Sequence, residues 1–223
     1  SVNVSESQSK MPLLSMAIAD GMGNKLYGGI ASAMTILTVD NLIVDRLDQS
    51  LDLVESIHNV VERSGINIRK MSLNRGYSGI GSTLVSLFSV GREAYISNIG
   101  DSRCYILRSG CLEQVTQDHN YLQELLDDEV LVRSEIDNNF SKVLTRVIGV
   151  KDKEIIDSHT RCLAPGDKVL LSSDGLHDYV GYQDIKNILE KEIIPETTCE
   201  KLINSANEAG GTDDVSVAVA ICT

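Results

Sequence analysis

Positive charge is scarce in this sequence: 20 Lys and Arg residues stand against 32 Asp and Glu residues, and the formal net charge is −12. Such a chain repels polyanions, so neither nucleic acid nor an anionic membrane is expected as a main partner. Long apolar runs are missing too. No stretch approaches the roughly 18 residues that a membrane-spanning helix needs, and no signal-peptide pattern opens the sequence. Cationic ligands, including metal ions, suit this charge better.

Closely spaced cysteine pairs are also absent. The cysteines are odd in number and contain no CxxC motif, so they indicate neither a disulfide framework nor a zinc knuckle. We expect reduced thiols in a cytoplasmic protein. The five residues are Cys104, Cys111, Cys162, Cys199 and Cys222.

What the sequence does have is enough apolar material for one sizeable core, with 42% hydrophobic residues in 223 positions. No repeat, low-complexity tract or linker divides it. We therefore predict a single domain over residues 1–223. The first residue is Ser1 rather than Met, which is compatible with a start inside a longer protein.

The spacing of apolar residues predicts helices and strands in an irregular order. Helices are expected at residues 26–47, from a cap at Ser50 to a stop at Gly65, and at 116–128, 184–190 and 198–209. Strands are expected at residues 13–19, 83–90, 94–99, 104–107, 155–163, 168–172 and 215–222. This order lacks the regular strand–helix alternation of a parallel sheet, and it favours an α+β fold with a two-sheet sandwich flanked by helices.

Three local predictions accompany this assignment. The helix at residues 26–47 has two apolar faces, so we expect it to be buried on more than one side. Asp118 is expected to cap the helix that follows it, and Arg103 is expected to form an internal ion pair. The acidic segment 129–142 loses all periodicity, which is typical of a functional loop inserted in a compact domain.

Acidic residues fall where strands are predicted to end. Asp20 follows one apolar strand, Asp101 and Asp174 follow two others, and the pair Asp213–Asp214 directly precedes the last strand. Glycine lies close to each of these strand ends. A single Asp-Gly pair is an ordinary turn, but four acidic strand ends at one edge of a sandwich would need a cation to offset their repulsion.

The ligand types indicate which cation. Carboxylate and carbonyl oxygens, with no His or Cys in these motifs, favour Mg²⁺ or Mn²⁺ over Zn²⁺. Two such ions about 4 Å apart would activate a shared water and clamp a phosphoryl oxygen, a known route to phosphoester hydrolysis.

A series of motifs then resembles one family, the type 2C metal-dependent serine/threonine protein phosphatases, most closely their bacterial members. The similar segments occur in the family's order: Asp20-Gly21-Met22-Gly23, Gly81-Ser82-Thr83, Gly100-Asp101-Ser102-Arg103, Leu144-Thr145-Arg146-Val147-Ile148-Gly149, Ser173-Asp174-Gly175-Leu176 and Asp213-Asp214. The fold that this resemblance implies is a four-layer αββα sandwich, with two antiparallel sheets flanked by helices.

The resemblance also implies roles for individual residues. Asp20 would bridge two metal ions, the Gly21 carbonyl would bind one of them, and Asp174 and Asp213 would complete the other. Asp101 would help to hold a third, weaker ion. The cofactor would be Mn²⁺ or Mg²⁺, and a metal-activated water would attack the phosphate.

Further implications concern partners and activity. The substrate would be a phosphoserine or phosphothreonine protein, the segment 129–142 would be a flap that contacts it, and a serine/threonine kinase would oppose the enzyme in signalling. The family's upstream Asn-Glu-Asp motif falls on Ser5, Glu6 and Ser7, so only Glu6 is kept, as an outer-shell residue of the metal site. A phosphate-binding Arg of the family corresponds to Val2. These departures leave a second hypothesis, a catalytically weakened relative that binds phosphoproteins as a regulatory module.

Overall fold

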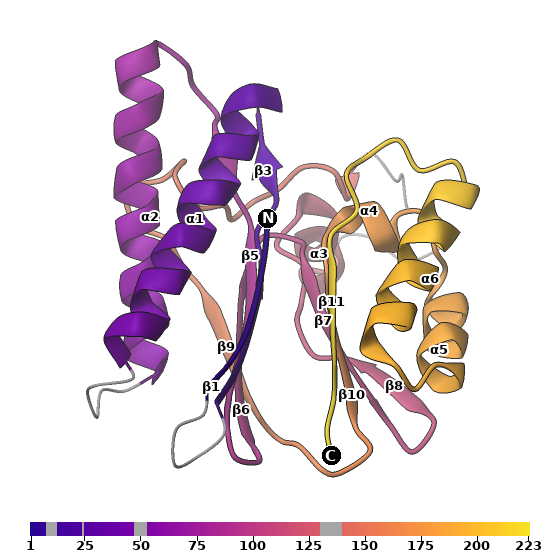
Figure 1. The fold of residues 1–223 in the computed structure, drawn as a ribbon. Helices are drawn as coiled ribbons and strands as arrows, with labels where there is room; N and C mark the ends of the chain where they lie inside the picture. The colour runs from indigo at the N-terminus through magenta and orange to yellow at the C-terminus, as the bar shows by residue number, and fades with distance from the viewer. Residues whose placement is uncertain (8–12, 24, 47–52, 130–139) are drawn as a thin grey trace.

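The structure of the chain is a computed structural model, and it describes residues 1–7, 13–23, 25–46, 53–129 and 140–223. Two antiparallel sheets form its centre (Figure 1). The first sheet has the order β1 (Val2–Ser7), β2 (Leu13–Ile18), β5 (Leu84–Val90), β6 (Glu93–Ile99), β9 (Asp157–Cys162). The second has the order β11 (Val217–Ile221), β10 (Lys168–Ser172), β7 (Arg103–Arg108), β8 (Cys111–Gln114). A two-residue pair, β3 (Gly21–Met22) and β4 (Gly81–Ser82), stands apart from both.

Helices cover the outer face of each sheet (Figure 1). The long helices α1 (Lys25–Arg46) and α2 (Leu53–Arg75) lie on the first sheet. Helices α5 (Tyr182–Lys191) and α6 (Pro195–Glu208) lie on the second, while α3 (Tyr121–Asp127) and the single turn α4 (Asp174–His177) lie at one end of the sandwich. The predicted αββα sandwich is therefore confirmed. Among the described residues, no helix is both long and apolar enough to cross a bilayer.

The alternation of side chains along the strands fills three apolar layers. Met16 and Ile18 of β2 pack between the sheets, whereas Ala17 between them faces α1 and α2. In the same way Val169 and Leu171 of β10 face the first sheet, and Leu170 faces α5 and α6. Because successive side chains of a strand point to opposite faces, both faces of each sheet are buried, which explains the nearly continuous apolar runs in these strands.

The chain passes from one sheet to the other three times, between β6 and β7, between β8 and β9 and between β9 and β10, and the sequence predicted none of these crossings. β6 and β7 are separated by residues 100–102 and belong to different sheets, and so do β9 and β10, which flank the Pro165-Gly166 turn. Gly100 has a φ of +102°, and a Cβ there would lie 2.6 Å from Cγ2 of Thr83. A glycine is thus required at the first crossing, and this crossing carries Asp101 to the end of the sandwich.

Two helix predictions are wrong, and a third lies outside the described residues. The predicted stop at Gly65 lies inside α2, where the missing side chain makes room for Glu154, whose Oε1 would be 2.9 Å from a Cβ. The predicted cap at Ser50 lies outside the described residues. The expected burial of α1 on two sides is also wrong, because Leu37 is 60% exposed while Val39 is fully buried.

Candidate metal centre

One cavity of about 430 Å³ opens at the end of the sandwich where β2, β6 and β10 finish. All four predicted carboxylates line it, each from a different segment of the chain. The residues around it are Asp20, Gly21, Met22, Thr83, Asp101, Lys142, Leu144, Asp174, Asp178, Tyr179, Thr212 and Asp213. The fold therefore gathers side chains that are up to 193 positions apart in the sequence into a single site.

The main chain of Asp20 is fixed by Thr83. The amide of Asp20 donates to the Thr83 hydroxyl at 3.0 Å, and the Thr83 amide donates to the Asp20 carbonyl at 2.7 Å. The Thr83 hydroxyl is in turn 2.7 Å from that of Ser102, next to Asp101. Thr83 and Ser102 are both buried. A hydroxyl pair thus connects the loop of Asp20 to the loop of Asp101, a role that sequence reasoning did not assign to Thr83.

We expect Thr83→Val to weaken Mn²⁺ binding by about tenfold, since residues that orient metal ligands typically contribute on that scale. Valine keeps the shape of the side chain but leaves the Asp20 amide without its acceptor. The measurement is a Mn²⁺ titration followed by calorimetry. Thr198→Val is the control, because Thr198 is an equally buried residue of α6 whose hydroxyl donates to Ile194 at 2.8 Å. Equal affinities in wild type and Thr83→Val would contradict the positioning role.

Asp174 and Asp213 are brought together by contacts between two neighbouring loops. The Ser173 amide donates to the Ser216 carbonyl at 3.0 Å, and the Ser216 amide donates to the Ser173 hydroxyl at 3.0 Å. Gly175 fits tightly beside this loop, since a Cβ on it would lie 2.5 Å from the Asp214 carbonyl oxygen. The start of α4 and the segment before β11 therefore form one unit.

The carboxylates carry more negative charge than their surroundings offset. Burial, followed by the charge of Asp20, raises the pKa of Asp174 to about 7. Burial also raises the pKa of Asp20, against a hydrogen bond with Asp174 that lowers it, and burial together with the Asp174 charge raises the pKa of Asp101 well above its ordinary value. Oδ1 of Asp174 is buried without a hydrogen-bond partner among the described residues.

These features fit a hard divalent cation. The unpartnered carboxylate oxygen, the mutual repulsion of the acids and the all-oxygen donor set are what Mg²⁺ and Mn²⁺ satisfy. No three Asp, Glu, His or Cys side chains in the described part of the chain already converge on one point. Asp20 and Asp174 nevertheless lie within hydrogen-bonding distance of each other.

Two predicted parts of the site do not gain support. Glu6 pairs with Leu14 across β1 and β2, and Ile18 pairs with Val2. The backbone of Glu6 therefore lies four pairs away from the strand end that leads to Asp20, which does not favour the outer-shell role, and its side chain lies outside the described residues. Of the predicted flap 129–142, residues 130–139 are also not among the residues that the structure describes.

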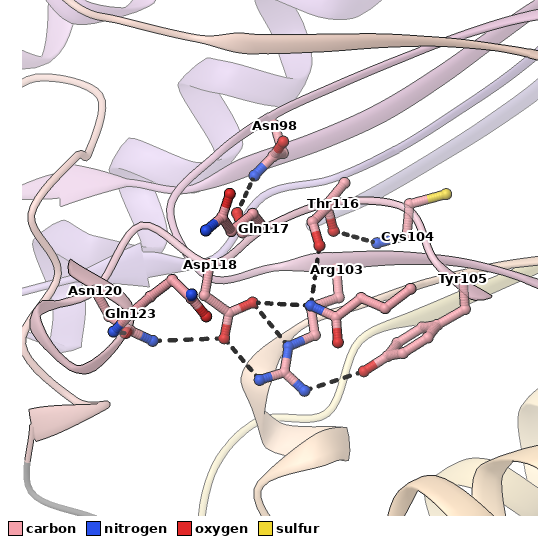
Figure 2. Close-up of polar contacts among 10 residues, drawn as sticks. Asn98, Arg103, Cys104, Tyr105, Thr116, Gln117, Asp118, Asn120 and Gln123 are labelled. Carbon is pink, nitrogen blue, oxygen red and sulfur yellow. Dashed lines mark hydrogen bonds and ion pairs between the residues drawn. The ribbon is translucent and has the colours of Figure 1, made fainter. Parts of the chain in front are cut away.

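Arg103 forms the predicted internal ion pair, and its partner corrects another prediction. Its guanidinium holds both carboxylate oxygens of Asp118, at 2.8 and 2.6 Å, and also donates to the Tyr105 hydroxyl at 3.1 Å (Figure 2). Asp118 is therefore not the cap of the following helix. That position belongs to Asn120, whose side chain accepts from the Gln123 amide at 2.9 Å.

His119 holds the crossing loop that carries Asp101. Its amide donates to the Gly100 carbonyl at 2.9 Å, and its Nδ1 accepts from the Gly100 amide at 3.2 Å. Nε2 lies 3.0 Å from Asp157, which also binds Arg146 at 2.9 Å. Burial lowers the pKa of His119, which suits a neutral ring with Nδ1 as acceptor. Sequence reasoning missed this contact, because nothing in the spacing of His119 relates it to Gly100.

Fold and site together define a class of protein: an αββα sandwich with an acidic centre for divalent metal ions at one end. The chain belongs to the protein phosphatase 2C family, whose model matches residues 4–205. It is 33% identical over 204 residues to protein phosphatase PhpP of Streptococcus pneumoniae. This alignment covers 91% of this chain and 83% of that relative. The chain is 30% identical over 226 residues to the serine/threonine phosphatase stp of Listeria monocytogenes, covering 96% and 86%.

Solved structures show the same relationship. The serine/threonine phosphatase of S. agalactiae superposes with a TM-score of 0.88 at 28% identity, covering 100% of this chain and 92% of that one. The catalytic domain of the phosphatase PstP, solved in complex with two manganese ions, superposes with a TM-score of 0.80 at 29% identity, covering 99% and 96%.

Proposed function

We propose that this protein is a metal-dependent protein serine/threonine phosphatase that hydrolyses phosphoserine and phosphothreonine. One observation carries the proposal: four carboxylates from four separate segments line a single cavity, with a buried oxygen on Asp174 and raised pKa values at Asp20, Asp101 and Asp174 that a cation would resolve, in a chain of this family. We further propose that residues 1–223 form one catalytic domain, which acts in the cytoplasm in opposition to a serine/threonine kinase.

The residues would divide the work as follows. Asp20, the Gly21 carbonyl, Asp174 and Asp213 would hold two Mn²⁺ or Mg²⁺ ions, and Asp101 would help to hold a third. When bound there, divalent ions supply Lewis-acid stabilisation of the phosphoryl group and an activated water. Thr83 keeps the main chain of Asp20 in place.

The lining of the cavity also bears on the path of the reaction. Among its described residues there is no Cys or His, the Thr83 hydroxyl is paired with that of Ser102, and the Thr212 hydroxyl is paired with that of Tyr179. We therefore expect direct attack by water and no covalent enzyme intermediate. Met22, which also lines the cavity, has no proton to give, and we propose that the leaving serine or threonine alkoxide takes its proton from water.

The test is hydrolysis of para-nitrophenyl phosphate and of a phosphothreonine peptide by protein stripped of metal with a chelator. We expect background rates without metal and a full return of both activities on addition of Mn²⁺. Equal rates with and without Mn²⁺ would contradict the proposal. Binding of the peptide without turnover would instead support the weakened, regulatory relative.

A further inference from the structure

The cavity contains one residue that the proposed chemistry does not use, Lys142. Its side chain is exposed and lines the same cavity as the four carboxylates. It is the only Lys or Arg among the described lining residues. Within the described part of the chain, its ammonium group forms no salt bridge, so it is available to a ligand.

The main chain around Lys142 is anchored rather than loose. The carbonyl of Val143 accepts from the Tyr121 amide at 2.8 Å, and the Thr145 amide donates to the His119 carbonyl at 2.9 Å. Phe140, on the other side, packs edge-on against the Tyr121 ring with centroids 5.7 Å apart. Because these contacts bracket Lys142, its backbone stays at the rim of the cavity while its long side chain can reach inward.

The charges of the residues that line the cavity suggest what Lys142 binds. Five acidic residues line it, Asp178 in addition to the four already described, so with Lys142 the ionised lining has a formal charge of −4. Two divalent cations would bring this to neutral. A phosphate monoester dianion then meets a neutral cavity in which the Lys142 ammonium is the one positive side chain among the described lining residues. Burial and the charge of Asp174 raise the pKa of Asp178, and the Lys142 ammonium acts to lower it. The ammonium therefore lies close enough to Asp178 to interact with its carboxylate.

We propose that Lys142 is a substrate-binding residue whose ammonium group contacts the phosphate of the phosphorylated residue at the mouth of the cavity. The inference rests on the proposed phosphatase function and specifies it. An ammonium–phosphate contact is a charge-assisted interaction, and it acts on ground-state binding because the phosphate is negatively charged before the reaction begins. Lys142 should therefore affect affinity more than turnover.

The experiment compares Lys142→Gln, Lys142→Arg and the control Lys191→Gln with wild type, all loaded with Mn²⁺. Lys191 is an exposed lysine at the end of α5 and does not line the cavity. We measure binding of inorganic phosphate by calorimetry at low and high salt, and kcat and KM for a phosphothreonine peptide. Lys142→Gln should weaken phosphate binding and raise KM about five- to tenfold, the loss expected for one charged contact, with kcat within about twofold.

The other variants make the result specific. Lys142→Arg should stay within about twofold of wild type, and Lys191→Gln should be indistinguishable from it. The difference between Lys142→Gln and wild type should shrink at high salt, because exposed charges are screened. Thermal unfolding should be the same for all four proteins.

Two kinds of failure are distinguishable. If wild type hydrolyses the peptide with Mn²⁺ but Lys142→Gln binds phosphate equally well, this inference alone is overturned. The same holds if kcat falls while phosphate affinity is unchanged, or if Lys142→Arg loses as much affinity as Lys142→Gln. If wild type shows no Mn²⁺-dependent hydrolysis, the proposed function is overturned and this inference with it.

Discussion

Asp174→Asn should lower Mn²⁺-dependent hydrolysis by about a thousandfold, because it removes the charge of a proposed metal ligand from a centre whose electrostatic stabilisation is worth several kcal/mol. At the same time it should raise the melting temperature of the metal-free protein at neutral pH. The carboxylate is forced into a buried position beside Asp20, which raises its pKa to about 7, and the amide removes that repulsion. Opposite effects on activity and stability distinguish a functional acid from a structural one.

The pH dependence of this prediction has a definite sign. An unfolded Asp loses its proton near pH 3.9, whereas folded Asp174 holds its proton up to about pH 7. Between these values the folded metal-free protein binds more protons than the unfolded chain, so its stability falls as the pH rises from about 4 to about 7. This fall should be smaller in Asp174→Asn.

The measurements are steady-state kinetics with added Mn²⁺ and thermal unfolding in a chelator from pH 4 to 8. Asp152→Asn is the matched control, because the Asp152 side chain is fully exposed and its contact with Arg69 is 4.0 Å long. It should change neither quantity. Wild-type activity in Asp174→Asn, or a lower melting temperature at neutral pH without metal, would refute the assignment of Asp174 as a metal ligand.

Arg103→Met should lower the free energy of unfolding by about 3 kcal/mol, as expected when one partner of a buried ion pair is removed. Asp118 would be left nearly buried, at 9% side-chain exposure, and the partners that the described residues still offer it are Gln114 and Asn120, each at 3.4 Å. The geometry is two-pronged (Figure 2), so Arg103→Lys should not restore stability, since an ammonium cannot match both oxygens.

The free energy of unfolding is measured by urea denaturation. A second substitution, at Asp118, separates the loss of the ion pair from the cost of leaving the Asp118 carboxylate buried without its partner. Arg103→Met/Asp118→Asn should be less destabilised than the sum of its single variants, because asparagine leaves no unpaired charge. Arg161→Met is the control: its ion pair with Glu113 is exposed, and such pairs contribute under about 1 kcal/mol. An equal, small loss in Arg103→Met and Arg161→Met would contradict the importance of the buried pair.

The sequence predicted the acidic centre because each of its acids is marked locally. A strand ending in Asp beside Gly is visible from a few neighbouring residues, and motif order then indicated the family. The pairing of strands was less accessible. That β7 leaves the sheet of β6 depends on the turn at Gly100 packing against Thr83, 17 positions earlier, and such contacts leave no periodic signal.

The errors around helices have the same origin. Asp118 and Asn120 are equally good helix caps by residue type. The carboxylate of Asp118 is bound by Arg103, so Asn120 is the residue that caps the helix. Glycine is a residue type that often ends a helix, but Gly65 lies inside α2, where the absence of a side chain allows the close approach of Glu154. In both cases a partner distant in sequence overrides a local preference.

The loops of the acidic centre do not belong to one sheet. Asp20 continues from β2 of the first sheet, whereas Asp174 and Asp213 flank β10 and β11 of the second. An ion held by Asp20 together with Asp174 or Asp213 would link the two halves of the sandwich at the end where the acidic cavity lies. Metal occupancy would then affect the rigidity of this end of the molecule as well as its chemistry. Loss of the metal would allow the two sheets to move more freely relative to each other.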